Sequence, residues 1–296
     1  MSFMARVHLL VAASLVILAT GCSKRVELPP VANVSFSASS PRVAIESPVD
    51  FTYKFEVLPG AAINGDYAVF VHILHPRGDV LWTDDHQPPI KTSQWKAGQT
   101  IGPYTRTRFI PPFPYDGRAT VVIGLYKPGG DERLTLASTM NEPKYAKVQE
   151  FKVGELEILP ATDNFRLGRG WYDLGGDPAI PADRARWTEQ SATINLRNPK
   201  QDVTLYLEAN ARIDAFSSPQ MVTIVANGQP VTTFAADNAE RAIRRIPISA
   251  AQLGTADIVE IRIEVDRTFN PSKLPVSNGD NRELALHVYN VFVGPK

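Results

Sequence analysis

The densest group of side chains able to do chemistry consists of three histidines and two aspartates: His72, His75, Asp84, Asp85 and His86. Imidazole nitrogens and carboxylates bind divalent metals, and a histidine beside a carboxylate can carry protons. The segment His75–Asp79 has the residues of a hairpin turn, and counting outward from it sets His72 opposite Trp82. Adjacent Asp84 and Asp85 would point to opposite faces of a strand. We therefore expect a hydrogen-bonded structural role for this group and no metal site.

Three aromatic residues of the second half are of the kind that stacks on sugar rings: Trp171, Tyr172 and Trp187. Such side chains combine a flat apolar face with a polar edge. They flank the loop 175–178, which could present them together on one surface. We expect at least one of the three to contact ligand, with Asp173 or Asn195 accepting hydrogen bonds from sugar hydroxyls. The alternative is that the tryptophans fill the core, as large aromatic side chains usually do.

Known catalytic motifs are missing from the sequence. It contains no Gly-x-Ser-x-Gly elbow, no His-Glu-x-x-His pair and no Gly-x-x-x-x-Gly-Lys phosphate loop. A glycosidase needs two carboxylates at a set separation, and Asp173, Asp177 and Asp183 could supply them. Aspartates in loops more often form turns. We predict no catalytic residue and no cofactor.

The only cysteine, Cys22, ends a segment with the pattern of an export signal. Arg6 and His8 precede a short apolar run from Leu9 to Ala19, and this run is too short to span a bilayer comfortably. The pattern resembles a bacterial lipobox, although Ala19 stands where such boxes usually carry leucine. The resemblance implies that residues 1–21 are a signal peptide, that Cys22 carries a diacylglycerol, and that the membrane is a partner through this lipid.

Residues 22–33 are expected to form a lipidated tether, with two adjacent prolines that stiffen the chain. Ser23 follows the cysteine, whereas an aspartate there would favour retention in the inner membrane of Gram-negative bacteria. By resemblance to that sorting system, the outer membrane is the favoured location. With Cys22 lipidated, no cysteine remains for a disulfide bond or a zinc site.

The overall charge is balanced, with 31 lysines and arginines against 31 aspartates and glutamates. Proteins that bind nucleic acid through its phosphates concentrate positive charge, and no block of basic residues occurs here. Nucleic acid is therefore not an expected partner. The length of 296 residues is enough for two hydrophobic cores of ordinary size.

Most of the elements that must position the candidate residues are predicted strands, in which apolar and polar side chains alternate. Residues 51–57 alternate aromatic or branched side chains with polar ones, which is typical of a strand with one buried face. The runs 67–74 and 119–126 are almost wholly apolar and suit central strands buried on both faces. Clusters of proline, glycine and aspartate separate these runs.

The same rhythm resumes after Gly154, where we place the domain boundary. Asn227-Gly228 predicts a tight hairpin turn, because both central residues of such a turn need positive φ. Residues 249–253 could make one helical turn. Many short strands with frequent turns predict an all-β protein with two antiparallel β-sandwich domains, residues 34–154 and 155–296.

Several segments of the first half resemble the β-sandwich module that follows the membrane helices of bacterial mannosyltransferase-type glycosyltransferases: Val69–Leu74, Pro76-Arg77-Gly78, Pro103-Tyr104-Thr105 and Gly124–Pro128. This likeness implies an Ig-like sandwich. The transferase helices have no counterpart in the sequence, so it does not imply transferase activity.

Segments of the second half are similar to jelly-roll, carbohydrate-binding-like modules found near bacterial glycan-assembly proteins: Gly170-Trp171-Tyr172, Arg186-Trp187-Thr188, Val225–Gly228 and Asp280–Leu284. Ala285 stands where this pattern usually has glycine. Most of these motif residues form turns and cores, so the likeness specifies fold better than function.

Together these features predict a lipid-anchored, non-catalytic binding or assembly module of the bacterial cell envelope, with a glycan or an envelope protein complex as its partner. One alternative is a structural subunit that docks onto a larger membrane or surface complex. A second alternative is a hydrolase.

Overall fold

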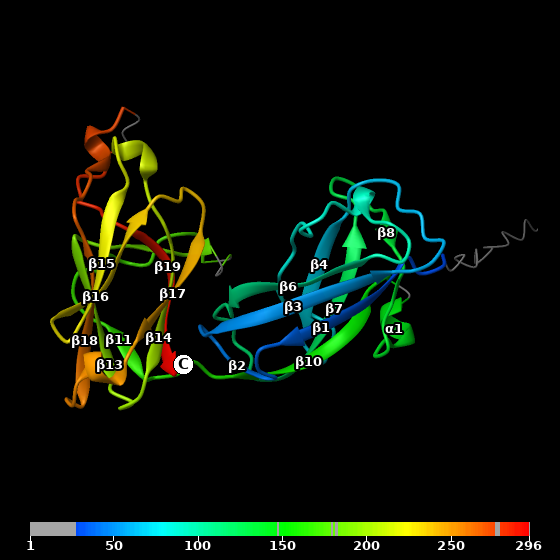
Figure 1. Ribbon diagram of the computed structural model, residues 1–296, viewed down its shortest axis with the longest axis horizontal. Coiled ribbons are helices and arrows are strands. Elements are labelled where there is room, and N and C mark those ends of the chain that lie inside the picture. The colour runs from blue at the N-terminus through cyan, green and yellow to red at the C-terminus, as the bar shows by residue number, and fades with distance from the viewer. Residues whose placement is uncertain (1–27, 147, 179, 181–182, 276–278, 296) are drawn as a thin grey trace, which may run out of the picture.

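The protein is built of two β-sandwiches that lie side by side (Figure 1). The computed structural model describes residues 28–295 except 147, 179, 181–182 and 276–278. One hydrophobic core extends from Ala32 to Ile158, and a separate one extends from Ile194 to Val293. The predicted all-β class is confirmed.

The first sandwich consists of two sheets. The first sheet has the strand order β6-β3-β1-β9: β6 (Thr100–Phe109), β3 (Pro48–Val57), β1 (Ala32–Ala38) and β9 (Leu136–Ala137). The second has the order β2-β10-β7-β4-β5, with β8 also paired to β7: β2 (Arg42–Ala44), β10 (Phe151–Leu159), β7 (Gly117–Tyr126), β4 (Ala68–Leu74), β5 (Val80–Thr83) and β8 (Arg133–Leu134). Pairing is antiparallel except for the short pairs β1·β9 and β10·β2, which are parallel.

The strands of this sandwich follow the predicted burial patterns. Along β3, Phe51, Tyr53 and Phe55 are buried on one face, whereas the residues between them are not. In β4 and β7 most residues of both faces are buried. The guanidinium of Arg133 lies over the ring of Phe70 on the outer face of β4, which helps to cover that face. A helical turn, α1 (Pro143–Ala146), and a 3₁₀ turn at Thr92–Gln94 complete the unit.

The domain boundary lies further along the chain than the expected Gly154. This glycine is inside β10, where it pairs with Val121 of β7 just after a β-bulge. A Cβ atom at this position would lie 3.3 Å from the ring of Phe36, so the glycine permits close packing and does not end the strand. The first sandwich starts at Ala32 and reaches Leu159, and residues 160–164 connect it to the second.

The second sandwich is antiparallel throughout its described pairs. Its outer sheet, on the side away from the first sandwich, has the order β11-β13-β18-β15-β16: β11 (Phe165–Leu167), β13 (Ser191–Arg197), β18 (Ile258–Val265), β15 (Gln220–Ala226) and β16 (Gln229–Ala236). Its inner sheet has the order β12-β19-β14-β17: β12 (Arg186–Trp187), β19 (His287–Pro295), β14 (Val203–Asn210) and β17 (Ala242–Ile248).

The hairpin turn and the helical turn predicted for this half are both present. Asn227 and Gly228 have φ of 49° and 76° and join β15 to β16 in a tight hairpin. The helical turn α2 (Ala250–Leu253) begins at Ser249, whose hydroxyl and backbone form a capping box with Gln252. Two 3₁₀ turns lie at Ile213–Ala215 and Pro271–Lys273.

The inner sheet of the second sandwich faces the first sandwich (Figure 1). Arg245 of β17 donates hydrogen bonds to the carboxylate of Asp50 in β3 and to the hydroxyl of Thr107 in β6. These contacts place the edge strand β6 opposite β14 and β17.

The predicted lipid attachment at Cys22 lies outside the described residues. Among the described residues, no helix has the length and apolar character needed to span a bilayer.

The observed boundary predicts how fragments behave. A fragment of residues 28–160 should unfold cooperatively in urea, whereas residues 28–153 should not fold, because they lack Leu156 and Ile158. Each of these side chains is 2% exposed, and burying a side chain of this size contributes about 2 kcal/mol. The second sandwich, residues 160–296, should fold alone and serves as the control. Equal stability of fragments 28–160 and 28–153 would show that the end of β10 is not part of the first core.

Candidate functional site

The expected group of histidines and aspartates is divided between two faces of the β4–β5 hairpin. His75 faces Asp79 as predicted, but a bulge between Ile73 and Leu74 shifts the register, so His72 pairs with Thr83 and not with Trp82. His72 lies on the outer face, with its Nδ1 3.5 Å from the carboxylate of Glu150. The expected group therefore does not converge.

The two aspartates point in opposite directions, as expected. Asp85 is exposed and its carboxylate accepts a hydrogen bond from the backbone N–H of Val71 at 3.1 Å, whereas Asp84 and His86 are buried. No group of three or more histidine, cysteine, aspartate or glutamate side chains suited to a metal occurs in the described part of the chain.

Asp84 directly follows β5, and its fully buried carboxylate contacts Arg106 and Arg108 of β6. It accepts a hydrogen bond of 2.8 Å from the hydroxyl of Tyr53. Arg106 donates to it from Nη2 at 3.0 Å and from Nε at 3.1 Å, and Nε of Arg108 lies 2.9 Å from Oδ1. A buried charge is tolerated only when it is paired and hydrogen-bonded. Here Tyr53 and Arg106 donate the hydrogen bonds, and Arg108 adds a second ion pair.

His86 extends this group of contacts as a neutral imidazole. Its Nδ1 donates to the backbone carbonyl of Asp84 at 2.7 Å, because a carbonyl can only accept. Its Nε2 must then accept from the hydroxyl of Tyr104, 2.8 Å away. Burial, aided by the positive charge of Arg106, lowers the pKa of His86. Burial also raises the pKa values of Tyr53 and Tyr104, and the Asp84 charge raises both further.

Arg106 and Arg108 extend from this buried anchor to the surface. They lie two residues apart on β6 and therefore on the same face of the strand. Their side chains are 31% and 34% exposed. Both line an open cleft of about 410 Å³ between the two sandwiches. Sequence reasoning missed these arginines, although the alternation Thr105-Arg106-Thr107-Arg108 is a visible signal of two like charges on one strand face.

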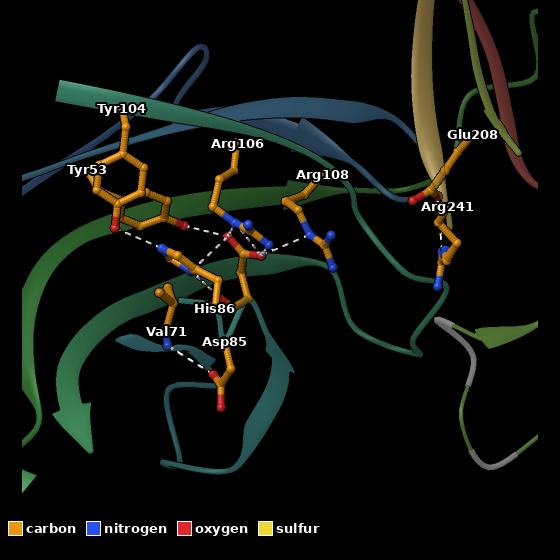
Figure 2. Close-up of polar contacts among 10 residues, drawn as sticks. Tyr53, Val71, Asp85, His86, Tyr104, Arg106, Arg108, Glu208 and Arg241 are labelled. Atoms are coloured by element: carbon orange, nitrogen blue, oxygen red, sulfur yellow. Dashed lines mark hydrogen bonds and ion pairs between the residues drawn. The ribbon is translucent and has the colours of Figure 1, made fainter. Parts of the chain in front are cut away.

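The opposite wall of the cleft carries Glu208 of β14 and Arg241, which directly precedes β17 (Figure 2). Nη2 of Arg241 donates to Glu208 at 3.1 Å, and Nη1 donates to Asp183 at 3.3 Å. Glu208 also accepts from the amide of Asn290. Glu208 pairs with Asn290, whereas Ala209 pairs with Val288, so Tyr289 is the extra residue of a bulge in β19. Such bulges redirect side chains, and this one sets Asn290 beside Glu208.

An aromatic strip formed by Trp187, His287 and Tyr289 continues from this wall. Trp187 and His287 are cross-strand partners whose rings stack at 4.3 Å and 21°. Tyr289 meets His287 edge to face at 4.9 Å and lies 3.9 Å beneath the guanidinium of Arg241. All three rings are half-buried and none belongs to the second core cluster. The strip therefore lies on the face of the inner sheet that points away from that core. Nδ1 of His287 donates to the side-chain carbonyl of Asn210 at 3.1 Å.

The other predicted sugar contacts are not on this strip. Trp171 packs against the second core, and its Nε1 donates to the carbonyl of Thr193 at 2.8 Å, which matches the expected alternative of a core tryptophan. The hydroxyl of Tyr172 donates to the carbonyl of Glu283, and Arg282 covers its ring. Asn195 is exposed on β13, in the opposite sheet from Trp187. The three aromatic residues therefore do not form one platform.

The loop aspartates considered for hydrolysis differ in their surroundings. Asp173 and Asp177 are exposed, whereas Asp183 is paired with Arg241 at the rim of the cleft.

No known protein family and no curated protein matches the sequence. Solved structures with some similarity include a family 35 carbohydrate-binding module from an environmental isolate, with 11% identity over 45% of this chain and 93% of that chain and a TM-score of 0.29. The carbohydrate-binding module CBM36 in complex with calcium and xylotriose has 12% identity, covers 44% and 94% of the two chains, and has a TM-score of 0.26.

An exo-β-1,3-galactanase of Phanerochaete chrysosporium has 10% identity over 89% of this chain and 56% of that chain, with a TM-score of 0.29. At TM-scores this low, none of these likenesses bears on what the chain binds. The resemblances noted in the sequence stay predictions.

The buried imidazole predicts a pH dependence of stability. The unfolded state binds a proton at His86 near its ordinary pKa of 6.5, whereas the folded state resists protonation because its pKa is lowered. Stability should therefore be full above this range and fall as the pH drops from 7.5 to 5.5. In urea unfolding, His86→Gln should show a smaller loss over this interval. His287, whose pKa burial also lowers, accounts for a remaining slope. Identical slopes for wild type and variant would contradict the neutral state of His86.

Proposed function

We propose that the protein is a non-catalytic, lipid-anchored glycan-binding module of the bacterial cell envelope, and that the sugar lies on the aromatic strip. The observation that carries this proposal is the combination of three half-buried aromatic rings with the amides of Asn210 and Asn290 on one sheet face. Aromatic faces stack on the C–H face of a pyranose, and amides exchange hydrogen bonds with hydroxyls.

The rings are held before any ligand arrives. Trp187 has His287 on one side and the edge of Phe269 at 5.4 Å, and Arg241 fixes Tyr289 from above. Rigid side chains lose little conformational freedom on binding, which favours affinity. Each stacked ring contributes on the order of 1 kcal/mol, so a single site binds weakly and a lipid-anchored array binds through many sites at once.

A binding role fits the carboxylates of the cleft better than a catalytic one. Asp84 is bonded to two arginines and a tyrosine, and Glu208 to Arg241 and Asn290. Both carboxylates thus already face guanidinium groups, whereas a glycosidase needs one carboxyl group placed to donate a proton to the substrate. The hydrolase alternative would require one of these contacts to break on ligand binding.

The structural-subunit alternative has one supporting observation. An open groove between the edges of β16 and β17 is lined by apolar side chains, among them Val231, Phe234 and Ile246, together with Arg244 and Arg245. A protein partner could add a strand or an apolar side chain there. The glycan proposal is preferred because the aromatic strip combines stacking surfaces with hydrogen-bonding groups.

Replacing Trp187 tests the strip directly. On a glycan array and then by calorimetry, the chain lacking residues 1–22 should bind a saccharide, and Trp187→Ala should lower that affinity about fivefold or more, because one stacking ring is lost. Trp187→Phe should retain most of it. Trp171→Phe is the matched control, since its indole faces the core, and should leave affinity unchanged. Melting temperatures identify any variant that has not folded. Wild-type affinity in folded Trp187→Ala would refute the strip as the binding surface.

Lipid anchoring has a separate test. Two acyl chains on Cys22 would give stable attachment, because each buried methylene contributes about 0.8 kcal/mol. In cell fractionation the wild type should therefore sediment with the outer membrane, and Cys22→Ser should become soluble. A soluble wild type without lipid on its N-terminal peptide would exclude the anchor and leave the glycan proposal standing.

A further inference from the structure

We propose that the glycan bound at the aromatic strip is acidic, and that Arg106 and Arg108 receive its carboxylate or phosphate. This inference rests on the proposed glycan-binding function and specifies its ligand. The first observation is the state of the two guanidinium groups: both are bound on one side by Asp84, and both are about one-third exposed on the other. One carboxylate cannot neutralise two arginines, so positive charge remains at this wall of the cleft.

The geometry of Arg108 leaves its binding atoms available. It contacts Asp84 through Nε, at 2.9 Å, which leaves Nη1 and Nη2 for another partner. Figure 2 shows the end of this guanidinium directed away from Arg106, toward the side of the cleft where Glu208 and Arg241 lie. Two adjacent N–H groups of an arginine match the two oxygens of a carboxylate or phosphate in a bidentate pair.

Asp84 acts as a positioning residue for this anion site. Two arginines on one strand face repel each other, and a free guanidinium on a surface samples many rotamers. The buried carboxylate holds both in one orientation, with Tyr53 held against its second oxygen. An oxyanion that enters the cleft therefore meets donors that are already in place.

The opposite wall of the cleft is not a second anion site. Arg241 pairs there with Glu208 and, at the rim, with Asp183, whose side chain is 66% exposed, so that wall has two carboxylates for one guanidinium. Arg245 is paired with Asp50 beside the cleft. Among the ion pairs of the described residues, Arg106 and Arg108 share one carboxylate, that of Asp84, so the surplus positive charge of the cleft lies at this pair.

The aromatic strip and the arginine wall together indicate one ligand class. Arg241 covers the ring of Tyr289 and shares the cleft with Arg108, so a sugar on the strip beside Arg241 can extend an acidic group toward Arg108. An acidic saccharide satisfies both surfaces, whereas a neutral one leaves the arginines without a ligand. Nucleic acid also carries oxyanions, but the balanced charge of the chain, 31 basic against 31 acidic residues, favours a ligand of lower charge density.

The test compares acidic saccharides with their neutral counterparts. Three probes cover the carboxylate and phosphate sources: oligogalacturonate, hyaluronan oligosaccharide and phosphorylated mannan oligosaccharide. Their controls are the carboxyl-reduced forms of the first two and the dephosphorylated form of the third. The protein lacking residues 1–22 should bind at least one acidic probe tenfold more tightly than its control, and this preference should shrink as salt is raised.

Two variants locate the effect. Arg108→Gln should lower affinity for the preferred acidic probe about tenfold and leave affinity for its neutral control unchanged. Arg118→Gln is the matched control, because it removes the same charge from a side chain that is 79% exposed on β7 and does not line the cleft. It should bind like the wild type. Circular dichroism and melting temperature show whether Arg108→Gln has folded, and Arg106→Lys is the second variant if it has not.

The outcomes separate this inference from the proposed function. Equal affinity of Arg108→Gln and Arg118→Gln for the acidic probe would overturn the arginine site, as would equal binding of acidic and neutral probes. Neutral binding that depends on Trp187 would then leave the glycan function intact. Absence of binding to every saccharide would overturn both. Single-stranded DNA bound as tightly as the acidic probe, with the same loss in Arg108→Gln, would replace the saccharide by a general polyanion.

Discussion

The burial of one charge, the Asp84 carboxylate, determines which side chains of the first sandwich face the second. A carboxylate with no exposed surface costs several kcal/mol unless other groups solvate it, and removing one partner of such a pair is strongly destabilising. Tyr53 from β3 and two arginines from β6 meet this need across the open edge between the sheets. Because both arginine side chains extend inward to Asp84, the N–H groups that do not contact this carboxylate are held at the cleft.

The surface of the second sandwich that faces this edge is shaped by the β-bulge in β19. The extra residue Tyr289 joins the aromatic strip, and Asn290 turns beside Glu208. Arg241 links the two features, since it lies over Tyr289 and donates to Glu208. Arg245 reaches across to Asp50 and Thr107, so the two walls are connected where the cleft forms. Aromatic and charged groups thus come together from segments nearly two hundred residues apart in the chain.

The sequence contained much of the fold and only part of the candidate site. Period-two patterns identified the strands, because one face of each must be buried, and Asn227-Gly228 identified its hairpin from the positive φ it needs. The bulge near Leu74 and the strand continuing through Gly154 were missed, since a glycine or an extra residue inside a strand looks like its end. Trp187 was found. Its expected neighbour Trp171 instead faces the core, because adjacent strands can present their tryptophans to opposite faces.

The cleft partners could not be predicted because they depend on pairing between distant strands. The alternation of Arg106 and Arg108 is visible, and Asp84 was noted for its chemistry, but only the packing of β6 across from β5 brings them together. Glu208 and Arg241 likewise meet only in the folded sheet.

Hydrogen–deuterium exchange with and without an acidic oligosaccharide tests most directly whether the cleft is the binding site. Slower exchange in β6, residues 100–109, together with β19, residues 287–295, is the result expected if the ligand lies between the two sandwiches. Protection confined to residues 170–178, beside Trp171 and Tyr172, or to the groove between β16 and β17, would contradict it.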